Sequence, residues 1–299
     1  MNSLFIITKR NIKLFFKDKG MFFTSLITPM ILLVLYATFL GNIYKDTFMS
    51  VFPAGFEVKE SLINACVGGQ LTSSILAVSC VTVAFCSNML MVQDKANSTI
   101  NDFSVTPVDK RVMSLGYYIA TLFSTLLICF AATGICLVYV ASVGFYMSLV
   151  DVLLLFLDVF ILVLFGVAIS SIINFFLSTQ GQISAVGSII SAAYGFICGA
   201  YMPISQFSEG LRDVLSFMPG TYGTSLIRNH AMRGVLEEMS QSGVPEEMIK
   251  GIKDTIDCNI YIFDTPVDIG TMYLILGGSA VLLIAVYVLM NVFKRKQKN

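Results

Sequence analysis

Asp151 and Asp158 are the only charged residues between Val112 and Ser208. They are seven apart, so on a helix they share one face and lie about 10 Å apart along its axis. An ionised carboxylate at membrane depth costs up to about 3 kcal/mol, which makes Asp158 a candidate for proton or cation handling. The alternative is a structural role, with Asp158 protonated and hydrogen-bonded to a serine, and the lack of Lys or Arg in the apolar stretches favours it. Asp151 is expected to reach the outer interface.

Motifs for other chemistry are absent from the sequence, which has no GxxxxGK[ST] phosphate loop and no HExxH, GxSxG or paired-cysteine motif. The seven cysteines lack metal-ligand spacing, and only Cys66 and Cys258 could meet, as a disulfide across the outer loops. His230 is the only histidine and is expected to be a surface or packing residue. The chain is therefore predicted to have no catalytic residue, metal site or cofactor of its own, so uphill transport would draw on a partner or an ion gradient.

Apolar helices must position these residues. The chain has 299 residues, of which 56% are hydrophobic and 13% charged, and its mean hydropathy is +0.80. A soluble domain carries about 25% charged residues, and a lipid core of about 30 Å requires roughly 20 apolar residues of helix. The sequence thus predicts an all-α polytopic membrane protein with one transmembrane domain, 21–293. Its six membrane-spanning helices are expected near residues 21–41, 67–92, 113–141, 149–176, 181–202 and 269–293.

The distribution of Lys and Arg predicts that both termini lie in the cytosol. In that orientation the cytosolic segments, including a basic tail at 294–299, hold most of the basic residues, whereas acidic residues dominate outside. Residues 1–20 are predicted to form an amphipathic helix along the inner leaflet, the alternative being a plain basic flank. One face of this helix is apolar, and the other carries Lys9, Arg10, Lys13 and Lys17.

The predicted cytosolic connection between the second and third spans reads NSTINDFSVTPVDKR, residues 97–111. A short helix here would have one apolar side, formed by Ile100 and Phe103, and would end at Thr106-Pro107, because the residue before proline avoids helical angles. Such a helix suits docking into a groove on a cytosolic protein. An ordinary solvated loop is the alternative.

The segment 203–268, before the last predicted span, is expected to lie outside. Its stripe at helical spacing, formed by Phe207, Leu211, Val214, Leu215 and Met218, should lie against the outer face of the bundle. Because non-helical backbone at membrane depth must be buried in protein or line water, a re-entrant hairpin is predicted. A helix that only caps the bundle is the alternative. Pro245-Glu246-Glu247 is a helix start, and Ile249, Ile252 and Ile256 give that helix one apolar face, which indicates a small outer lid.

Both stretches resemble the type-2 ABC exporter permeases, which export drugs, lipids or peptides. That family has an acidic residue and then Gly-Thr-apolar-Glu-x-Leu-x-x-[ST]-Pro in its cytosolic coupling loop, and here Ser98 and Asn101 replace the Gly and Glu. The corresponding residues are Asp94, Thr99, Ile100, Phe103, Thr106 and Pro107. After its fifth span the family has a small residue, Pro, a short helix and Asn-Pro-x-x-Tyr, with Met218 here in place of Asn. The corresponding hairpin and gate residues are Gly199, Pro203, Phe207, Leu211, Pro219 and Tyr222.

The resemblance implies a permease subunit of an ATP-driven exporter in the plasma membrane of a bacterial cell. It implies a second permease copy or paralogue and two separate ATPase subunits, which bind ATP and Mg²⁺ and carry out hydrolysis. The second and fifth spans would border the path, and the hairpin would close its exit side. Two alternatives remain: an ion- or proton-coupled secondary transporter that uses Asp158, and an antimicrobial-sensing or resistance subunit. Nothing in the spans selects among drugs, lipids, peptides, glycans or ions as the substrate.

Overall fold

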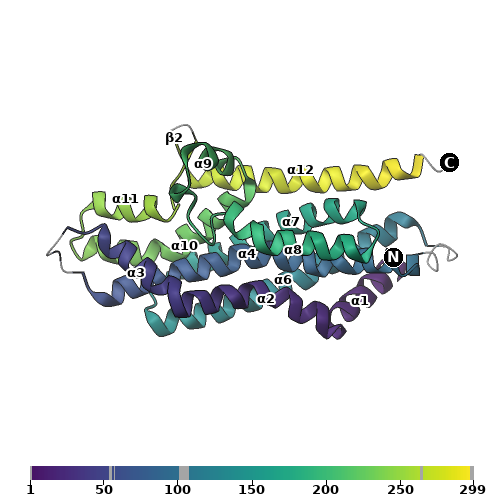
Figure 1. Ribbon diagram of the computed structural model, residues 1–299, viewed down its shortest axis with the longest axis horizontal. Helices are drawn as coiled ribbons and strands as arrows, with labels where there is room; N and C mark the ends of the chain where they lie inside the picture. The colour runs from purple at the N-terminus through teal and green to yellow at the C-terminus, as the bar shows by residue number, and fades with distance from the viewer. Residues whose placement is uncertain (1, 54–55, 57, 101–107, 263–264, 297–299) are drawn as a thin grey trace.

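The computed structural model describes residues 2–53, 56, 58–100, 108–262 and 265–296 as an elongated helical bundle with one small β-hairpin (Figure 1). The main long helices are α2 (Lys19–Leu35), α4 (Glu60–Ala96), α6 (Lys110–Val143), α7 (Leu149–Phe176), α8 (Gln180–Ile197), α10 (Pro219–Gln241) and α12 (Ile269–Lys296). The shorter elements are α1 (Asn2–Lys17), the π-helix η1 (Tyr36–Leu40), α3 (Gly41–Ser50), the 3₁₀ turn η2 (Ile204–Gln206), α9 (Glu209–Ser216), α11 (Glu246–Thr255), β1 (Ile260–Ile262) and β2 (Thr265–Val267). The two strands pair antiparallel, with Tyr261 opposite Pro266.

Five helical segments of the described residues are long and apolar enough to cross a membrane. They are Lys19–Ser50, Glu60–Ala96, Arg111–Val143, Leu149–Phe176 and Ile269–Val292. These contain the predicted first, second, third and fourth spans and most of the last. The chain is therefore a helical multi-pass membrane protein. Residues 294–296 of the predicted basic tail continue α12, and 297–299 lie outside the described residues.

The predicted fifth span, 181–202, extends beyond the C-terminal end of the corresponding helix. The corresponding helix, α8, ends at Ile197, and Gly199 adopts a φ of 71°, a left-handed conformation that ends helices. At 1.5 Å per residue, the 18 residues of α8 extend about 27 Å, close to the thickness of the lipid core. A sixth crossing at α8 therefore stays a prediction.

The start of α1 and the end of α12 lie at one end of the bundle, and α3 and α11 lie at the other (Figure 1). The predicted orientation requires the termini to share a side, and the arrangement is consistent with that requirement. At the first of these ends, α1 packs against α6. The fit is close, because a Cβ at Gly116 of α6 would lie 2.6 Å from a methyl group of Ile7. Which side of a membrane this end faces stays a prediction.

The centre of the bundle is α4, which packs against α2, α6, α7, α8 and α10. Small residues bring its neighbours close, as small residues do between membrane helices. A Cβ at Gly166 of α7 would lie 2.8 Å from the carbonyl oxygen of Cys80 in α4. This close packing explains why the apolar stretch of α4 is almost wholly buried, whereas α2 and α12 leave most of theirs exposed.

The segment 203–268, predicted to form an outer hairpin and a lid, also contributes a helix of the bundle, α10. This helix packs against α4, α7 and α12 and buries polar residues along much of its length. The low hydropathy of α10 prevented its recognition as a bundle helix in the sequence. It can lie in the bundle because Arg228, His230 and Arg233 have partners inside the protein. Hydropathy measures the cost of facing lipid, and α10 faces protein.

We expect Gly234→Ala to destabilise the protein by about 1–3 kcal/mol, because a core overpacked against backbone must shift. A Cβ at Gly234 in α10 would overlap the carbonyl oxygen of Tyr146, in the connection between α6 and α7. The matched control is Gly278→Ala on α12, where no atom lies within 4 Å of the added Cβ. The check is the midpoint of thermal unfolding in detergent, and equal midpoints for the two variants would contradict this close approach.

Candidate functional site

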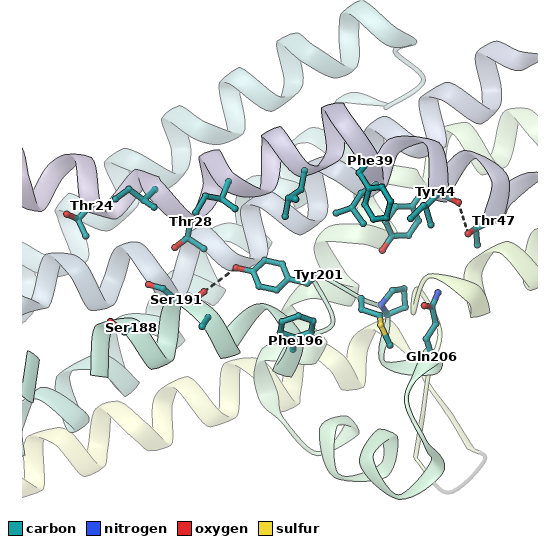
Figure 2. Close-up of a pocket in the computed structure, with 18 residues that line it drawn as sticks. Thr24, Thr28, Phe39, Tyr44, Thr47, Ser188, Ser191, Phe196, Tyr201 and Gln206 are labelled. Carbon is teal, nitrogen blue, oxygen red and sulfur yellow. Dashed lines mark hydrogen bonds between the residues drawn. The ribbon is translucent and has the colours of Figure 1, made fainter. Parts of the chain in front are cut away.

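A groove of about 750 Å³ runs between the first membrane helix and α8 (Figure 2). One wall comes from α2, η1 and α3, and the other comes from α8 and the residues that follow it. The lining is Thr24, Ile27, Thr28, Ile31, Leu35, Phe39, Leu40, Ile43, Tyr44, Thr47, Ser188, Ser191, Ala192, Phe196, Tyr201, Met202, Pro203 and Gln206. None of these side chains carries a charge. A cleft of this size and apolar character, with a few polar groups, is typical of a small-molecule site.

Polar groups lie at both ends of the groove, with Tyr44, Thr47 and Gln206 at the end opposite the hydroxyls of α2 and α8 (Figure 2). Thr24 and Thr28 of α2 lie on one wall, and Ser188 and Ser191 of α8 lie on the other (Figure 2). The hydroxyl of Tyr201 donates to the carbonyl oxygen of Ser191 at 3.2 Å, which folds the residues after α8 back onto that helix.

The π-helix η1 shapes the middle of the first wall. Tyr36 faces the core, where its hydroxyl lies 3.2 Å from that of Ser74 on α4 and its ring stacks on Tyr44, with centroids 5.5 Å apart. Phe39 and Leu40, later in the same turn, line the groove. A π-turn adds a residue to the helical repeat and is frequent at functional sites. Here it places an aromatic ring in the groove while the same turn stays anchored to α4.

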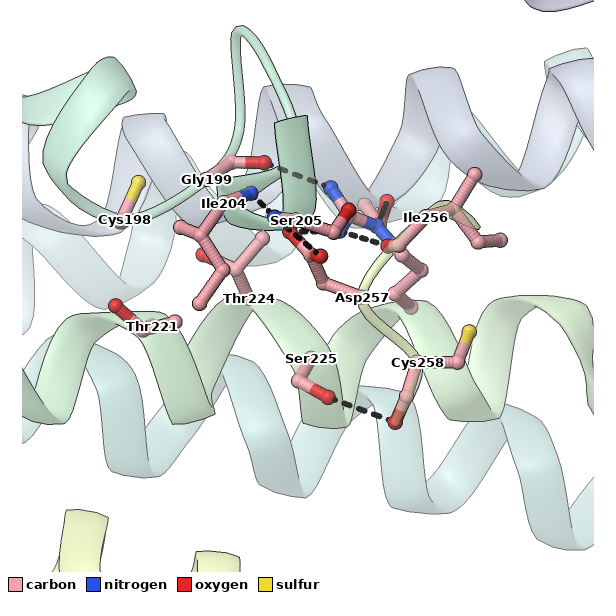
Figure 3. A network of polar contacts seen from close by, with 12 residues as sticks. Cys198, Gly199, Ile204, Ser205, Thr221, Thr224, Ser225, Ile256, Asp257 and Cys258 are labelled. Atoms are coloured by element: carbon pink, nitrogen blue, oxygen red, sulfur yellow. Dashed lines mark hydrogen bonds and ion pairs between the residues drawn. The ribbon is translucent and has the colours of Figure 1, made fainter. Parts of the chain in front are cut away.

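Arg228 of α10 holds the turn after α8 at the end of the groove. Its partners Gly199, Ile256 and Asp257 lie close together in Figure 3. Its side chain is fully buried and donates to the carbonyl oxygens of Gly199, at 3.0 Å, and of Ile256. It also lies 3.4 Å from the hydroxyl of Ser73 on α4 and 3.8 Å from the carboxylate of Asp257. One buried guanidinium therefore joins α4, the turn after α8 and the segment after α11.

Asp257 extends this network to η2. Its carboxylate accepts the backbone N–H groups of Ile204 and, at 3.1 Å, of Ser205. Burial raises the pKa of the Asp257 carboxyl, whereas Arg228 and these N–H groups act to lower it. The turn after α8 is thus held from both sides, by Arg228 at Gly199 and by Asp257 at η2.

The predicted gate residues are spread over this region. Gly199 and Pro203 lie in the turn before η2, Pro219 is the first residue of α10, and Tyr222 is buried in that helix. The stripe on α9 corrects the sequence expectation. Phe207 is half-buried and Leu215 is buried, but the other three positions face out: Leu211 is 44% exposed, Val214 56% and Met218 39%. Most of that stripe therefore does not lie against the bundle.

Asp158 has two partners that the sequence analysis missed. His230 Nδ1 lies 2.6 Å from one carboxylate oxygen, an ion pair when the imidazole is protonated. The hydroxyl of Tyr273 on α12 donates to the other oxygen. The expected serine partner is wrong. His230 was expected to be a surface or packing residue, and at only 3% exposed it is a packing residue. Both oxygens of Asp158 are therefore occupied by side chains of α10 and α12.

Asp151 caps its own helix and binds α10. It forms a capping box with Ser148 at the start of α7, and Arg233 Nη2 lies 2.6 Å from its other oxygen. His230 and Arg233 are three apart on α10, so they share a face, as do the two aspartates on α7. The contact between α7 and α10 could therefore have been inferred from sequence by matching the acidic face of one segment with the basic face of the other.

Asp94 and Lys95, at the end of α4 that leads to the predicted coupling segment, form a junction with neighbouring helices. Asp94 of α4 forms a two-bond ion pair with Arg10, with distances of 2.6 and 3.3 Å, and accepts a hydrogen bond from Tyr117 of α6. Arg10 was expected on the charged face of α1, where Lys9, Lys13 and Lys17 are indeed exposed, but it is half-buried on Asp94. Lys95 donates to the carbonyl oxygens that end α7, those of Asn174, Phe175 and Leu177.

Of the predicted coupling residues, Thr99 and Ile100 follow this junction and are half-buried in a helical turn. Phe103, Thr106 and Pro107 lie outside the described residues. Cys66 and Cys258 are both free and buried, so the disulfide considered from the sequence is not formed, and burial raises the pKa of Cys258 to about 12. Across the described ranges, no cluster of three or more His, Cys, Asp or Glu could hold a metal ion.

Comparison with protein families gives one match. The family model of the ABC-2 type transporter matches residues 2–231, more than half of the chain and all of the region from α1 to the first half of α10. No curated protein matches the chain.

Proposed function

Since this chain belongs to the ABC-2 type transporter family and is the membrane permease subunit of such a transporter, we propose that it exports a substrate with energy from a separate ATPase subunit. The observation that carries the proposal is the uncharged groove between the first membrane helix and α8. It is large enough for a small molecule and extends to the turn that carries Pro203. Two permease subunits, identical or paralogous, would face each other across such grooves in the plasma membrane.

The junction at the end of α4 supports coupling to an ATPase. The segment 97–109 follows directly from Asp94 and Lys95, which bind α1, α6 and α7. A displacement of this segment would therefore be transmitted to three helices through charged hydrogen bonds, which are the stronger class. In this proposal two ATPase subunits bind ATP and Mg²⁺, close on each other and move the segment at 94–107, and the bundle opens outward.

The turn after α8 fits the part of an exit gate. Gly199, Pro203 and η2 lie at the end of the groove and are held by Arg228 and Asp257. The helix α11 with its C-cap residue Ile256, here called the α11 unit, packs beside them through its apolar face, since Ile252 and Ile256 are buried. A movement of α10 would therefore move the gate and the α11 unit together.

The test is purification of the tagged chain from its own host in mild detergent, followed by identification of what co-elutes. We expect an ATPase to co-purify and to be lost from Ile100→Asp/Phe103→Asp, because the apolar side of the docking segment becomes charged. The matched control is Asn97→Asp/Ser98→Asp, which adds the same charge at two exposed positions and should retain the ATPase.

Two results would overturn the proposal. One is elution without any ATPase under conditions that keep a known ABC pair together. The other is export that persists when ATP is depleted and stops when the proton gradient is collapsed, which would support the ion-coupled alternative.

A further inference from the structure

We propose that the groove binds an uncharged, elongated amphipathic molecule, for which a long-chain alcohol is the simplest chemical example. The inference rests on the proposed function, because it names the substrate class of the same site. It follows from three properties of the groove: its lack of charge, the position of its free hydroxyls and the apolar, aromatic character of its middle.

The lack of charge in the lining excludes ionic ligands. All of the lining residues are neutral, and most of them are apolar. A carboxylate or an ammonium group entering such a groove would lose hydration without gaining a counter-ion, and an unpaired charge in an apolar site is strongly unfavourable. A neutral hydroxyl, amide or ester group loses far less, provided that it finds a hydrogen-bonding partner.

Such partners are present on both walls. Thr28 on α2, and Ser188 and Ser191 on α8, line the groove from opposite walls (Figure 2). Within the described residues, none of these three hydroxyls makes a hydrogen bond, although Thr28 is only 7% exposed. In contrast, the hydroxyls of Thr24 and Thr47 donate to carbonyl oxygens of their own helix. A hydroxyl can both donate and accept, so this part suits a neutral polar head.

The middle of the groove, between these hydroxyls and the polar end at Thr47 and Gln206, suits an apolar body. Phe39 and Tyr44 on one wall and Phe196 on the other flank the part beyond the hydroxyls (Figure 2). The volume of about 750 Å³ falls within the range of about 300–1,000 Å³ that holds drug-sized ligands. A ligand with its polar head between Thr28 and Ser191 would lay its chain toward η1.

The test uses the absence of tryptophan from the sequence, which makes Phe196→Trp a single fluorescent reporter inside the groove. The purified, nucleotide-free chain in lipid nanodiscs is titrated with three brominated quenchers that share a twelve-carbon chain: an alcohol, a carboxylate and a quaternary ammonium. The control reporter is Leu282→Trp on α12, where the side chain of Leu282 is 65% exposed and does not line the groove. We expect saturable quenching of the groove reporter by the alcohol, with at least tenfold higher affinity than for either charged probe, and only linear quenching of the control reporter.

Two further variants in the Phe196→Trp background test the roles of charge and hydroxyl groups. Thr28→Val/Ser191→Ala should weaken alcohol binding about tenfold, since each hydrogen bond contributes about 3- to 10-fold in affinity. Ser188→Lys should reverse the preference, so that the carboxylate binds better than the alcohol.

Three outcomes would overturn the inference. Equal, linear quenching of both reporters would show that bulk lipid tails fill the groove, and protection of the groove reporter from all three probes would show that a second copy covers it. Preference of the unmodified groove for a charged probe would show that another chemical class binds. Because no ATPase is present in this measurement, each of these results leaves the co-purification test of the proposed function unaffected.

Discussion

Arg228→Met is expected to lower the free energy of unfolding by about 3–5 kcal/mol, the range found when one partner of a buried ion pair is removed. The methionine fills a similar volume but leaves the carbonyl oxygens of Gly199 and Ile256 without their donor and Asp257 without its cation. The measurement is unfolding of the purified chain in mixed micelles, followed by circular dichroism.

Arg212→Met is the matched control for this variant. Arg212 lies on α9, pairs with Asp213 at 3.8 Å and is 40% exposed, so its loss should change stability by less than about 1 kcal/mol. Adding Asp257→Asn to Arg228→Met removes the uncompensated charge and should recover part of the loss. If Arg228→Met and Arg212→Met unfold alike, the buried network does not hold the turn after α8.

His230→Leu is expected to have a similarly large effect, a loss of about 3–5 kcal/mol, because it leaves Asp158 buried with only the hydroxyl of Tyr273. The double variant Asp158→Leu/His230→Leu replaces the whole pair by apolar groups and should be more stable than the single variant, since buried ion pairs can often be exchanged for hydrophobic ones. Unfolding of the same kind, arranged as a double-mutant cycle, measures this coupling.

Tyr273→Phe completes the set by removing one hydrogen bond and no charge, so a loss of about 1–3 kcal/mol is expected. For the cycle, the contradicting result is additivity. If Asp158→Leu/His230→Leu loses the sum of the two single-variant losses, Asp158 and His230 are not paired. Export by His230→Leu that depends on pH differently from the parent would instead revive a proton-handling role for Asp158.

The apolar helices could be predicted from sequence because length and hydropathy suffice for segments that face lipid. The fourth span, 149–176, coincides with α7, whose first turn is capped by Ser148. The fifth span was harder, because the residues at 198–202 are as apolar as the helix before them. Only the left-handed turn at Gly199 ends α8, and composition does not reveal it.

The charged contacts of the core could not be predicted in the same way. Asp158 was recognised as unusual, but its partner is 72 residues away in a helix whose composition resembles that of a water-exposed segment. Arg10 and Asp94 were assigned to different sites, whereas the fold joins them at 2.6 Å. Periodicity shows which residues share a face of one helix, but the pairing of two faces depends on how the chain is folded.

The charges of α10 also impose an order on the assembly of the protein. An arginine at the centre of a helix in lipid costs about 2.5–3.5 kcal/mol on insertion scales, so α10 is poorly suited to leave the translocon as an independent span. The acceptors of His230 and Arg233 lie in α7, which is made earlier, but Arg228 depends on Ile256 and Asp257, which are made later. Biogenesis of this bundle is therefore completed only after the ribosome has passed residue 257, when the last buried cation meets its partners.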